Sequence, residues 1–441
     1  MNELTEEQRS YLTKRRWVVL IASCLVNLCI GALYAWSVFA SPMAEVLSEA
    51  TGATLTAASL AIVFSIGNGD GFITLIGGGF LNQKIGPRWV IFFGGILFGL
   101  GFVICGMATN VGMLILGYGI CSGLGMGLAY GCTISNTVKF FPDNKGLIGG
   151  IATASYGISS VILPPVANAL INAMGVRTAF IAVGIFCLVV VGVCSQLIVK
   201  CPVGFRPSGW DPRNADAPVH HTVDRNWHQM LKDPIFYVML VMLFFGAVLG
   251  MMSISQASNV AQSMIGMSAS AAAVVVSVLA LFNTFGRILA GFISDRIGCV
   301  NTLTAVFVVA IGALSLIYLS AAGSVPLFYV GICLVGLCFG AFMGVYPSFT
   351  NGQFGAKYSS VNYGIMFIGF SAAGIAGPMI MSQVYGMFGT YRPAFLIALA
   401  LAVCGLALTF LYRAVHARTG HRHLKSSYLE RGVLPKGLRA H

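Results

Sequence analysis

Two ionisable side chains, Asp70 and Arg287, lie well inside the long apolar runs of this 441-residue sequence. A charged group at the centre of a bilayer costs about 2.5–3.5 kcal/mol on insertion scales, so such a residue is a candidate for function. The guanidinium of Arg287 offers five N–H donors in a planar fork, which matches a carboxylate through two parallel hydrogen bonds. All seven histidines lie outside the apolar runs, which excludes a proton relay through histidines within a membrane.

Arg287 has no acidic residue near it in the sequence, and Asn283 stands one helical turn before it. A guanidinium stays protonated at physiological pH, so it needs an anion when it is away from water. We therefore predict that Arg287 binds an anionic substrate. The alternative is a structural arginine that is neutralised by carbonyl groups at a helix end or by Asp70.

Asp70 lies among glycines, in the segment 68–71 (NGDG). A carboxyl group that is removed from water takes up a proton more readily, so Asp70 could couple proton movement to transport. It could equally be a structural cap where glycine loosens a helix. A third interpretation pairs Asp70 with Arg287, and such a pair would compete with the substrate and could gate its binding.

The composition selects a class of protein around these residues. The chain is 57% hydrophobic and 9% charged, whereas an ordinary soluble domain is about 25% charged. Its mean hydropathy is +0.86. These values exclude a disordered chain, a coiled coil and a typical cytosolic enzyme, and they leave a membrane protein with many spans. The net charge of +12 lies mostly between apolar runs, so we expect a bilayer and no nucleic acid as partner.

Twelve apolar runs are long enough to cross a bilayer, and each must be helical because irregular backbone cannot face lipid. Their approximate limits are 17–39, 55–80, 88–108, 112–137, 146–170, 177–199, 234–258, 269–294, 301–321, 325–350, 360–383 and 391–412. We predict a first six-helix bundle over 1–199, a cytoplasmic linker over 200–233, a second bundle over 234–412 and a basic tail over 413–441.

The basic residues predict the orientation of the chain. With the N-terminus in the cytoplasm, 22 of the 25 lysines and arginines fall on the cytoplasmic side. The exceptions are Arg177, Arg287 and Arg392. Cytoplasmic loops carry the excess of basic residues in membrane proteins, so we expect both termini in the cytoplasm.

The two halves repeat a short motif after their second spans. We predict that its glycines allow close helix contact and that its charges hold a cytoplasmic turn. The copies are Gly79-x-x-x-Gln83-Lys84-x-Gly86 and Gly291-x-x-x-Asp295-Arg296-x-Gly298. Two six-helix halves related in this way form a known transporter architecture.

The duplicated motif resembles the signature of the major facilitator superfamily, from which the first copy departs by Gln83 in place of an acid. Four further segments resemble the oxalate/formate antiporter family, and related monocarboxylate transporters share the arginine of the eighth span. The segments are 31–39 (GALYAWSVF), 138–146 (VKFFPDNKG), 207–212 (PSGWDP) and 283–287 (NTFGR). The resemblance implies an all-α fold of twelve spans in two pseudo-symmetric bundles, alternating access and a small carboxylate substrate.

The eleventh span departs from this family. Tyr363, Phe367, Phe370 and Gly374 share one helix face. The resemblance implies that oxalate-exchanging members have a lysine at the position of Phe370, which pairs with the arginine to hold a dicarboxylate. One cation then remains here, which favours a monocarboxylate such as formate, lactate or pyruvate. The alternatives are a shifted alignment with the second cation elsewhere, and an exchanger that binds oxalate despite Phe370.

The resemblance places tyrosines at the central cavity, and we expect aromatic and amide groups to complete the site. The substrate-binding candidates are Arg287, Tyr34, Tyr130, Tyr346, Phe370, Phe367, Tyr156 and Asn283. We predict a secondary carrier, not an enzyme, in a plasma or bacterial inner membrane. It would work by anion exchange or proton symport, with no cofactor or metal and as a monomer. A membrane sensor and a membrane enzyme are less favoured, since the tail is short and no paired catalytic groups lie in the spans.

Overall fold

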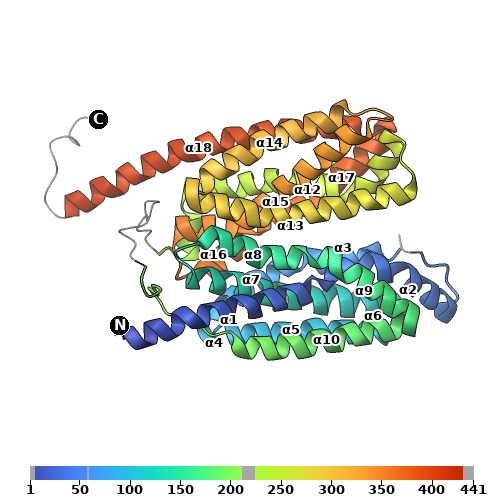
Figure 1. Ribbon diagram of the computed structural model, residues 1–441, viewed down its shortest axis with the longest axis horizontal. Coiled ribbons are helices and arrows are strands. Elements are labelled where there is room, and N and C mark those ends of the chain that lie inside the picture. The colour runs from blue at the N-terminus through green and yellow to red at the C-terminus, as the bar shows by residue number, and fades with distance from the viewer. Residues whose placement is uncertain (1–4, 57–58, 211–223, 431–441) are drawn as a thin grey trace.

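The computed structural model describes residues 5–56, 59–210 and 224–430, and within these ranges the chain forms helices and no strand. Figure 1 shows two helix bundles side by side along the long axis, the first in blue to green and the second in yellow-green to red. The start of α1 and the end of α18 lie at the same end of the molecule.

The first bundle is built from the helices before the linker. In chain order these are α1 (Glu6–Ile30), the 3-10 segment η1 (Gly31–Ala35), α2 (Trp36–Thr51), α3 (Ala61–Gly69), α4 (Gly71–Ile85), α5 (Pro87–Gly106), α6 (Val111–Leu114), the π-helical segment η2 (Ile115–Ser122), α7 (Gly123–Phe140), α8 (Lys145–Gly157), α9 (Ser159–Met174) and α10 (Val176–Leu197).

A short linker helix, α11 (Trp227–Leu231), precedes the second bundle. The second bundle contains α12 (Pro234–Ile265), α13 (Ala269–Ile297), α14 (Cys299–Leu319), α15 (Val325–Phe354), α16 (Ser359–Met366), α17 (Ile368–Phe388) and α18 (Arg392–Glu430). The predicted linker and tail lie partly outside the described residues, at 211–223 and 431–441. The domain limits at 199 and 234 stay predictions, near the end of α10 and the start of α12.

Eleven helical segments of the described chain are long and apolar enough to cross a membrane. The remaining predicted span, 55–80, is divided at Asp70 into α3 with 9 residues and α4 with 15, and each is shorter than the roughly 20 residues that a crossing needs. Asp70 keeps right-handed helical backbone angles, and its N–H donates to the carbonyl of Ile66 over 3.0 Å. The predicted all-α polytopic fold is confirmed, with one span interrupted at its only acid.

Helix ends at both copies of the repeated motif require glycine. Gly86 ends α4 with φ of +83°, and Gly298 ends α13 with φ of +85°. Side chains rarely adopt this left-handed backbone, so glycine closes each turn without strain. The next helices, α5 and α14, begin directly after these glycines.

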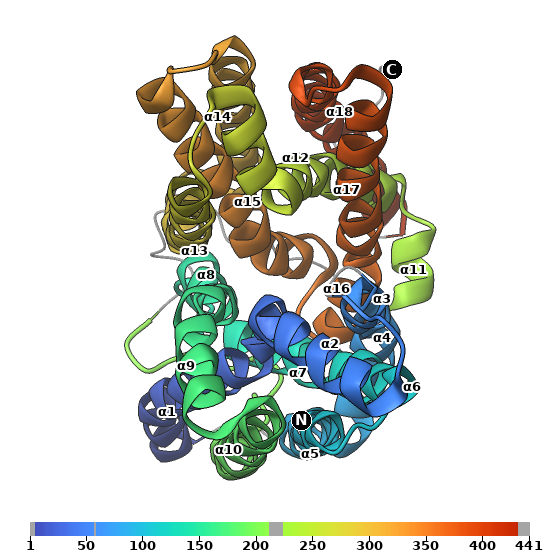
Figure 2. The same cartoon turned by 90° about the vertical axis from the view of Figure 1, so that its right-hand side faces the viewer.

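Glycine also brings the two bundles together at the end of the molecule where α1 begins, which we call the closed end. A Cβ on Gly79 of α4 would lie 2.7 Å from the backbone nitrogen of Val361 in α16. A Cβ on Gly291 of α13 would overlap the carbonyl oxygen of Gly146 in α8. Figures 1 and 2 show the same pairs of helices in contact, α4 with α16 and α8 with α13.

Hydrogen bonds across the bundles accompany the glycine contacts. Asp295 accepts the backbone N–H groups of Gly146 and Leu147 at the start of α8, both over 2.7 Å. The equivalent contact of the first motif copy is neutral. Asn82 donates to the hydroxyl of Ser360 over 2.8 Å, next to Gln83 where the signature has its acid. The closed end is therefore held by a charged bond on one side and by neutral bonds on the other.

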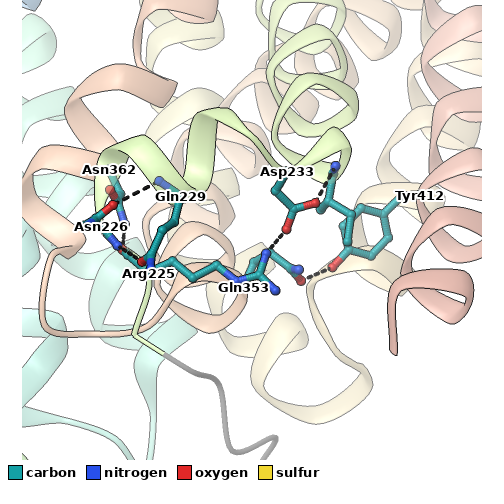
Figure 3. Close-up of polar contacts among 8 residues, drawn as sticks. Arg225, Asn226, Gln229, Asp233, Gln353, Asn362 and Tyr412 are labelled. Carbon is teal, nitrogen blue, oxygen red and sulfur yellow. Dashed lines mark hydrogen bonds and ion pairs between the residues drawn. The ribbon is translucent and has the colours of Figure 1, made fainter. Parts of the chain in front are cut away.

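The end of the linker fastens to the same region (Figure 3). Arg225 forms an ion pair with the buried Asp233 at the start of α12. The backbone of Arg225 donates to the carbonyl of Phe354 and accepts from the side chain of Asn362, both over 2.9 Å. These three contacts tie the linker to α12, α15 and α16, all of which belong to the second bundle.

The linker helix also contacts the first bundle. The ring of Trp227 in α11 packs edge-on against Phe80 of α4, with centroids 6.2 Å apart. Phe80 is next to Gly79, whose contact with α16 closes the bundles. The linker thus touches both bundles at the closed end.

Replacing Asp295 by alanine should favour opening of the closed end, because it removes an acceptor shared by two N–H groups of the opposite bundle. A hydrogen bond to a charged group contributes about 1.5–3 kcal/mol, so the open fraction should rise about tenfold or more. Spin labels on α4 and α16 measured by pulsed EPR in liposomes would report this as a longer distance component.

The matched control is Asp143→Ala, which removes a carboxylate from the same region. Asp143 binds Arg16 over 3.0 Å within the first bundle, and its described effect on the second bundle is electrostatic repulsion of Asp295. Its loss should therefore leave the longer distance component unchanged. If Asp295→Ala also leaves it unchanged, the glycine contacts hold the closed end without the carboxylate.

Candidate functional site

Arg287 lies in α13 where this helix contacts α8, and its side chain is only 3% exposed. Its Nη1 donates to the carbonyl oxygen of Thr153 in α8 over 2.7 Å. Its Nε donates to Oδ1 of Asn283, one turn earlier on its own helix, over 3.3 Å. The guanidinium is therefore oriented by one oxygen from each bundle.

No carboxylate of the described residues forms an ion pair with Arg287. Within the described part of the chain, the ion pairs join Arg9 with Glu6, Arg16 with Asp143 and Arg225 with Asp233. The acceptors of Arg287 are an amide oxygen and a backbone carbonyl, and these are dipoles without net charge. Burying an unpaired cation is expensive, so an anion that reaches the guanidinium gains a strong interaction.

Six aromatic side chains form a continuous row beside Arg287, here called the aromatic row. In order of contact they are Tyr34, Tyr156, Tyr130, Phe367, Phe370 and Phe339, with ring centroids 5.2, 4.9, 6.0, 4.5 and 6.2 Å apart. The row begins in η1, α8 and α7 of the first bundle and ends in α17 and α15 of the second. It therefore crosses between the bundles at the level of the arginine.

Four tyrosine hydroxyls of this region interact electrostatically with the guanidinium of Arg287. They are those of Tyr34, Tyr130, Tyr156 and Tyr363. A tyrosine hydroxyl can donate to a carboxylate while its ring packs against apolar groups. The arrangement can therefore hold one carboxylate at its polar end and an apolar group along the aromatic row.

Glycines allow the backbones around Arg287 to approach closely. A Cβ on Gly157 of α8 would lie 3.2 Å from Cζ of Arg287. A Cβ on Gly150 of α8 or on Gly344 of α15 would overlap the carbonyl oxygen of Arg287. The α13 backbone is thus enclosed between α8 and α15, and this packing fixes the position of the Arg287 backbone.

The structure brings together most of the predicted substrate-binding residues, with Tyr346 as the exception. Tyr346 is fully buried in α15, and its hydroxyl donates to the carbonyl of Met239 in α12 over 2.9 Å. Its ring packs on Phe349, away from the aromatic row. Since its polar group is already satisfied within the second bundle, we leave Tyr346 out of the proposed site.

Asn283 and Phe370 have definite surroundings. Asn283 supports Arg287 through its amide oxygen, and its own carbonyl lies under Gly340 of α15. Phe370 is half-buried and packs between Phe367 and Phe339. Phe370, where the family resemblance implies a lysine in oxalate exchangers, is therefore part of an apolar wall formed with Phe367 and Phe339.

Asp70 is separate from Arg287. Its Oδ1 is buried without a hydrogen-bond partner in the described residues, and it lies against Gly123 of α7, where a Cβ would overlap it. Its side chain makes no cap bond to α4. Within the described chain, no ion pair joins Asp70 to Arg287, so the paired arrangement has no support in this conformation.

The basic members of the repeated motif lie at the surface. Lys84 is exposed, and Arg296 is exposed with its guanidinium 4.2 Å from the ring centre of Phe292 on the same helix. The buried Gly79 and Gly291 and the half-buried Asp295 make the contacts between bundles. The motif is thus divided between glycines and an acid that close the interface and cations that face outward.

Two residues next to the guanidinium of Arg287 were not predicted from the sequence. Thr153 contributes a backbone carbonyl, which any residue type would supply, so no sequence signal exists. Gly157 follows Tyr156, and only its lack of a side chain next to a predicted aromatic site residue hints at close packing. Both lie in α8, on the opposite bundle from the arginine.

The fold and site together define a polytopic α-helical membrane protein with a cationic anchor buried between two bundles. The chain belongs to the Major Facilitator Superfamily, whose family model matches residues 25–378. The predicted superfamily is thereby confirmed, and the known members of this kind are transporters.

Curated relatives cover most of the chain. It is 28% identical to the oxalate:formate antiporter of Oxalobacter formigenes over 98% of this chain and 100% of that protein. It is 28% identical to the uncharacterised MFS-type transporter YhjX of Escherichia coli (strain K12) over 82% of this chain and 86% of that protein. It is 26% identical to monocarboxylate transporter 12 of Rattus norvegicus over 76% and 72% of the two chains.

Solved structures share the fold. FucP in the outward conformation matches with a TM-score of 0.69 at 15% identity, over 90% of this chain and 99% of that one. The human organic anion transporter MFSD10 matches with a TM-score of 0.65 at 13% identity, over 92% of this chain and 100% of that one. At these identities the likeness establishes the architecture alone.

Replacing Gly150 by alanine should destabilise the protein, because the new Cβ would meet the backbone of Arg287, which cannot rotate away. Overpacking of this kind costs about 1–3 kcal/mol. The thermal midpoint of the purified protein in detergent should therefore fall.

Gly149→Ala on the same helix is the control. The nearest atoms to its added Cβ are 3.5 Å away, which is ordinary contact. Alanine also favours helix over glycine by about 1 kcal/mol, so the thermal midpoint should hold or rise. Equal falls in the two variants would contradict the tight fit of α8 on α13 at Gly150.

Proposed function

We propose that this protein is a secondary active carrier of small monocarboxylates of the formate, lactate or pyruvate type. The observation that carries the proposal is the buried Arg287, which is oriented by oxygen atoms of both bundles and has no carboxylate partner among the described residues. The substrate carboxylate supplies the missing negative charge. Tyr34 and Tyr130 add hydroxyl groups to the same anion.

The relatives support a carboxylate as substrate. The names of two of them specify oxalate and formate or monocarboxylates, and this chain aligns with nearly the whole length of the first. At 26–28% identity the substrate itself can differ between relatives. The choice among carboxylates must therefore follow from this chain's own residues.

Phe370 favours one negative charge on the substrate. Its ring lies between Phe367 and Phe339, so the second carboxylate of a dianion would meet apolar carbon. Losing hydration there without a partner is costly. The second candidate is oxalate/formate exchange, which the likeness to the oxalate:formate antiporter favours and the apolar wall opposes.

Transport would proceed by rocking of the two bundles about the site. We assign the closed end to the cytoplasm, because the loops at that end carry most of the lysines and arginines. Cytoplasmic loops are enriched in these residues, and the same rule places both termini in the cytoplasm. The conformation described here is then closed to the cytoplasm. We place the protein in a plasma or bacterial inner membrane, acting as a monomer.

Two coupling modes remain possible for this site. Arg287 has Asn283 one turn before it instead of an acid, which favours exchange of one anion for another. The orphaned carboxyl oxygen of Asp70 provides a candidate proton acceptor for symport. Uptake of pyruvate, lactate, formate and oxalate into proteoliposomes, with and without an internal anion and with and without a pH gradient, tests substrate and coupling together.

Replacing Arg287 by lysine should lower kcat/KM for the transported monocarboxylate by about tenfold or more. A lysine keeps the charge but loses the planar fork, and one charge-assisted hydrogen bond contributes about 1.5–3 kcal/mol. The control is Arg392→Lys, since Arg392 also donates to a backbone carbonyl, that of Ser320, over 2.8 Å. Unchanged uptake in Arg287→Lys would remove the anchor from the proposal.

Replacing Phe370 by lysine should create oxalate binding, because the second cation would face the second carboxylate. We expect oxalate to inhibit monocarboxylate uptake by this variant at least about tenfold more strongly than uptake by the wild type. This is the effect of one hydrogen bond between charged groups, which contributes about 1.5–3 kcal/mol. Phe370→Met changes the volume without adding charge and should leave oxalate inhibition as in the wild type. Equal behaviour of the two variants would mean that charge number does not set specificity here.

A further inference from the structure

Two successive carbonyl groups of α8 are bonded from opposite bundles. The carbonyl of Ala152 accepts a hydrogen bond from Nδ2 of Asn27 in α1 over 2.8 Å. The carbonyl of Thr153 accepts a hydrogen bond from Nη1 of Arg287 in α13 over 2.7 Å. One stretch of α8 backbone therefore lies between an amide of the first bundle and the guanidinium of the second.

Asn27 is itself held rigidly. Its side chain is completely buried, and its Oδ1 accepts the hydroxyl hydrogen of Thr133 in α7 over 2.8 Å. The hydroxyl of Thr133 lies within 2.9 Å of the carbonyl of Tyr130, whose ring belongs to the aromatic row. Asn27 thus joins α1, α7 and α8 at the point where the tyrosines and the arginine converge.

We propose that Asn27 is a positioning residue for the substrate site, and that it fixes the α8 carbonyl against which the Arg287 guanidinium is aligned. This inference rests on the proposed function, in which Arg287 binds the carboxylate. Asn27 has no exposed surface and acts through Arg287. A bidentate contact needs its groups held to within about 0.5 Å, which only a locked supporting layer provides.

A purely structural role for Asn27 would be to join α1 to α7 and α8. The same helices offer a matched comparison one turn away. The hydroxyl of Thr137 in α7 donates to the hydroxyl of Ser23 in α1 over 2.9 Å, and both residues are completely buried. This pair also links α1 to α7, but it has no described hydrogen bond to the Ala152–Thr153 carbonyls.

The test compares Asn27→Ala, Thr133→Val and Ser23→Ala in proteoliposomes with the four carboxylates used above. We expect Asn27→Ala to raise KM for the transported monocarboxylate by about tenfold, with kcat within about twofold, by analogy with metal sites, where loss of a supporting contact costs about 10–100-fold in affinity or activity. Thr133→Val, which removes the hydroxyl that bonds Oδ1 of Asn27 and contacts the carbonyl of Tyr130 but leaves the Asn27 amide in place, should raise KM by less. Ser23→Ala should leave KM unchanged.

Thermal midpoints in detergent separate positioning from stability. Asn27→Ala and Ser23→Ala should both lower the midpoint, whereas only the first should alter KM. If Asn27→Ala and Ser23→Ala change KM alike, or if neither does, Asn27 is structural and the inference is wrong. If Asn27→Ala fails to fold, Thr133→Val takes its place, and an unchanged KM in that variant overturns the inference.

The Arg287→Lys variant distinguishes this inference from the proposed function. If Arg287→Lys leaves KM and kcat unchanged, the anchor role itself fails. If Arg287→Lys lowers kcat/KM while Asn27→Ala and Thr133→Val leave KM unchanged, the proposed function stands and the positioning role alone is overturned. The double variant that combines Asn27→Ala with Arg287→Lys should lose less kcat/KM, in free-energy terms, than the sum of the two single losses, because Asn27 acts through the arginine.

Discussion

A permanent positive charge removed from water is the constraint that the rest of this structure meets. The described chain offers the guanidinium of Arg287 dipoles instead of a carboxylate. Such a site is tolerable only if the dipoles are well aimed, because each missed contact leaves part of the charge unsolvated. The amide of Asn283, the carbonyl of Thr153 and the neighbouring tyrosine hydroxyls together act as a solvent shell made of protein.

That solvent shell is possible because helix backbones come very close. Gly150 and Gly344 enclose the backbone of α13 from two sides, and Gly157 lies under the guanidinium. Further along α8 and α13, Gly146 and Gly291 meet at the closed end. The same helix pair therefore carries Arg287 and forms part of the contact between the bundles, so in the proposed function binding at the arginine is coupled to the state of the closed end.

The residue types suggest the charged and aromatic members of the proposed site, and the contacts that arrange these residues came only from the structure. Arg287 is visible in the sequence because a lone arginine in an apolar run is unusual, and the neighbouring tyrosines are visible through family resemblance. Thr153 is invisible because a carbonyl has no sequence signature. Tyr346 was predicted for the site, but its hydroxyl bonds within its own bundle, and spacing along a helix cannot tell which neighbour satisfies a polar group. The predicted second span, 55–80, forms two shorter helices divided at Asp70, and the apolar pattern of the sequence does not reveal this division.

The glycine seams have a consequence for how this protein can change over generations. Where Gly79 contacts Val361 and Gly291 contacts Gly146, the helices can approach closely only because glycine has no side chain. A larger residue there would push the two helices of each pair apart and so disfavour the described conformation. Positions that face lipid tolerate exchange among apolar residues. Substitutions will therefore accumulate there and not at these glycines.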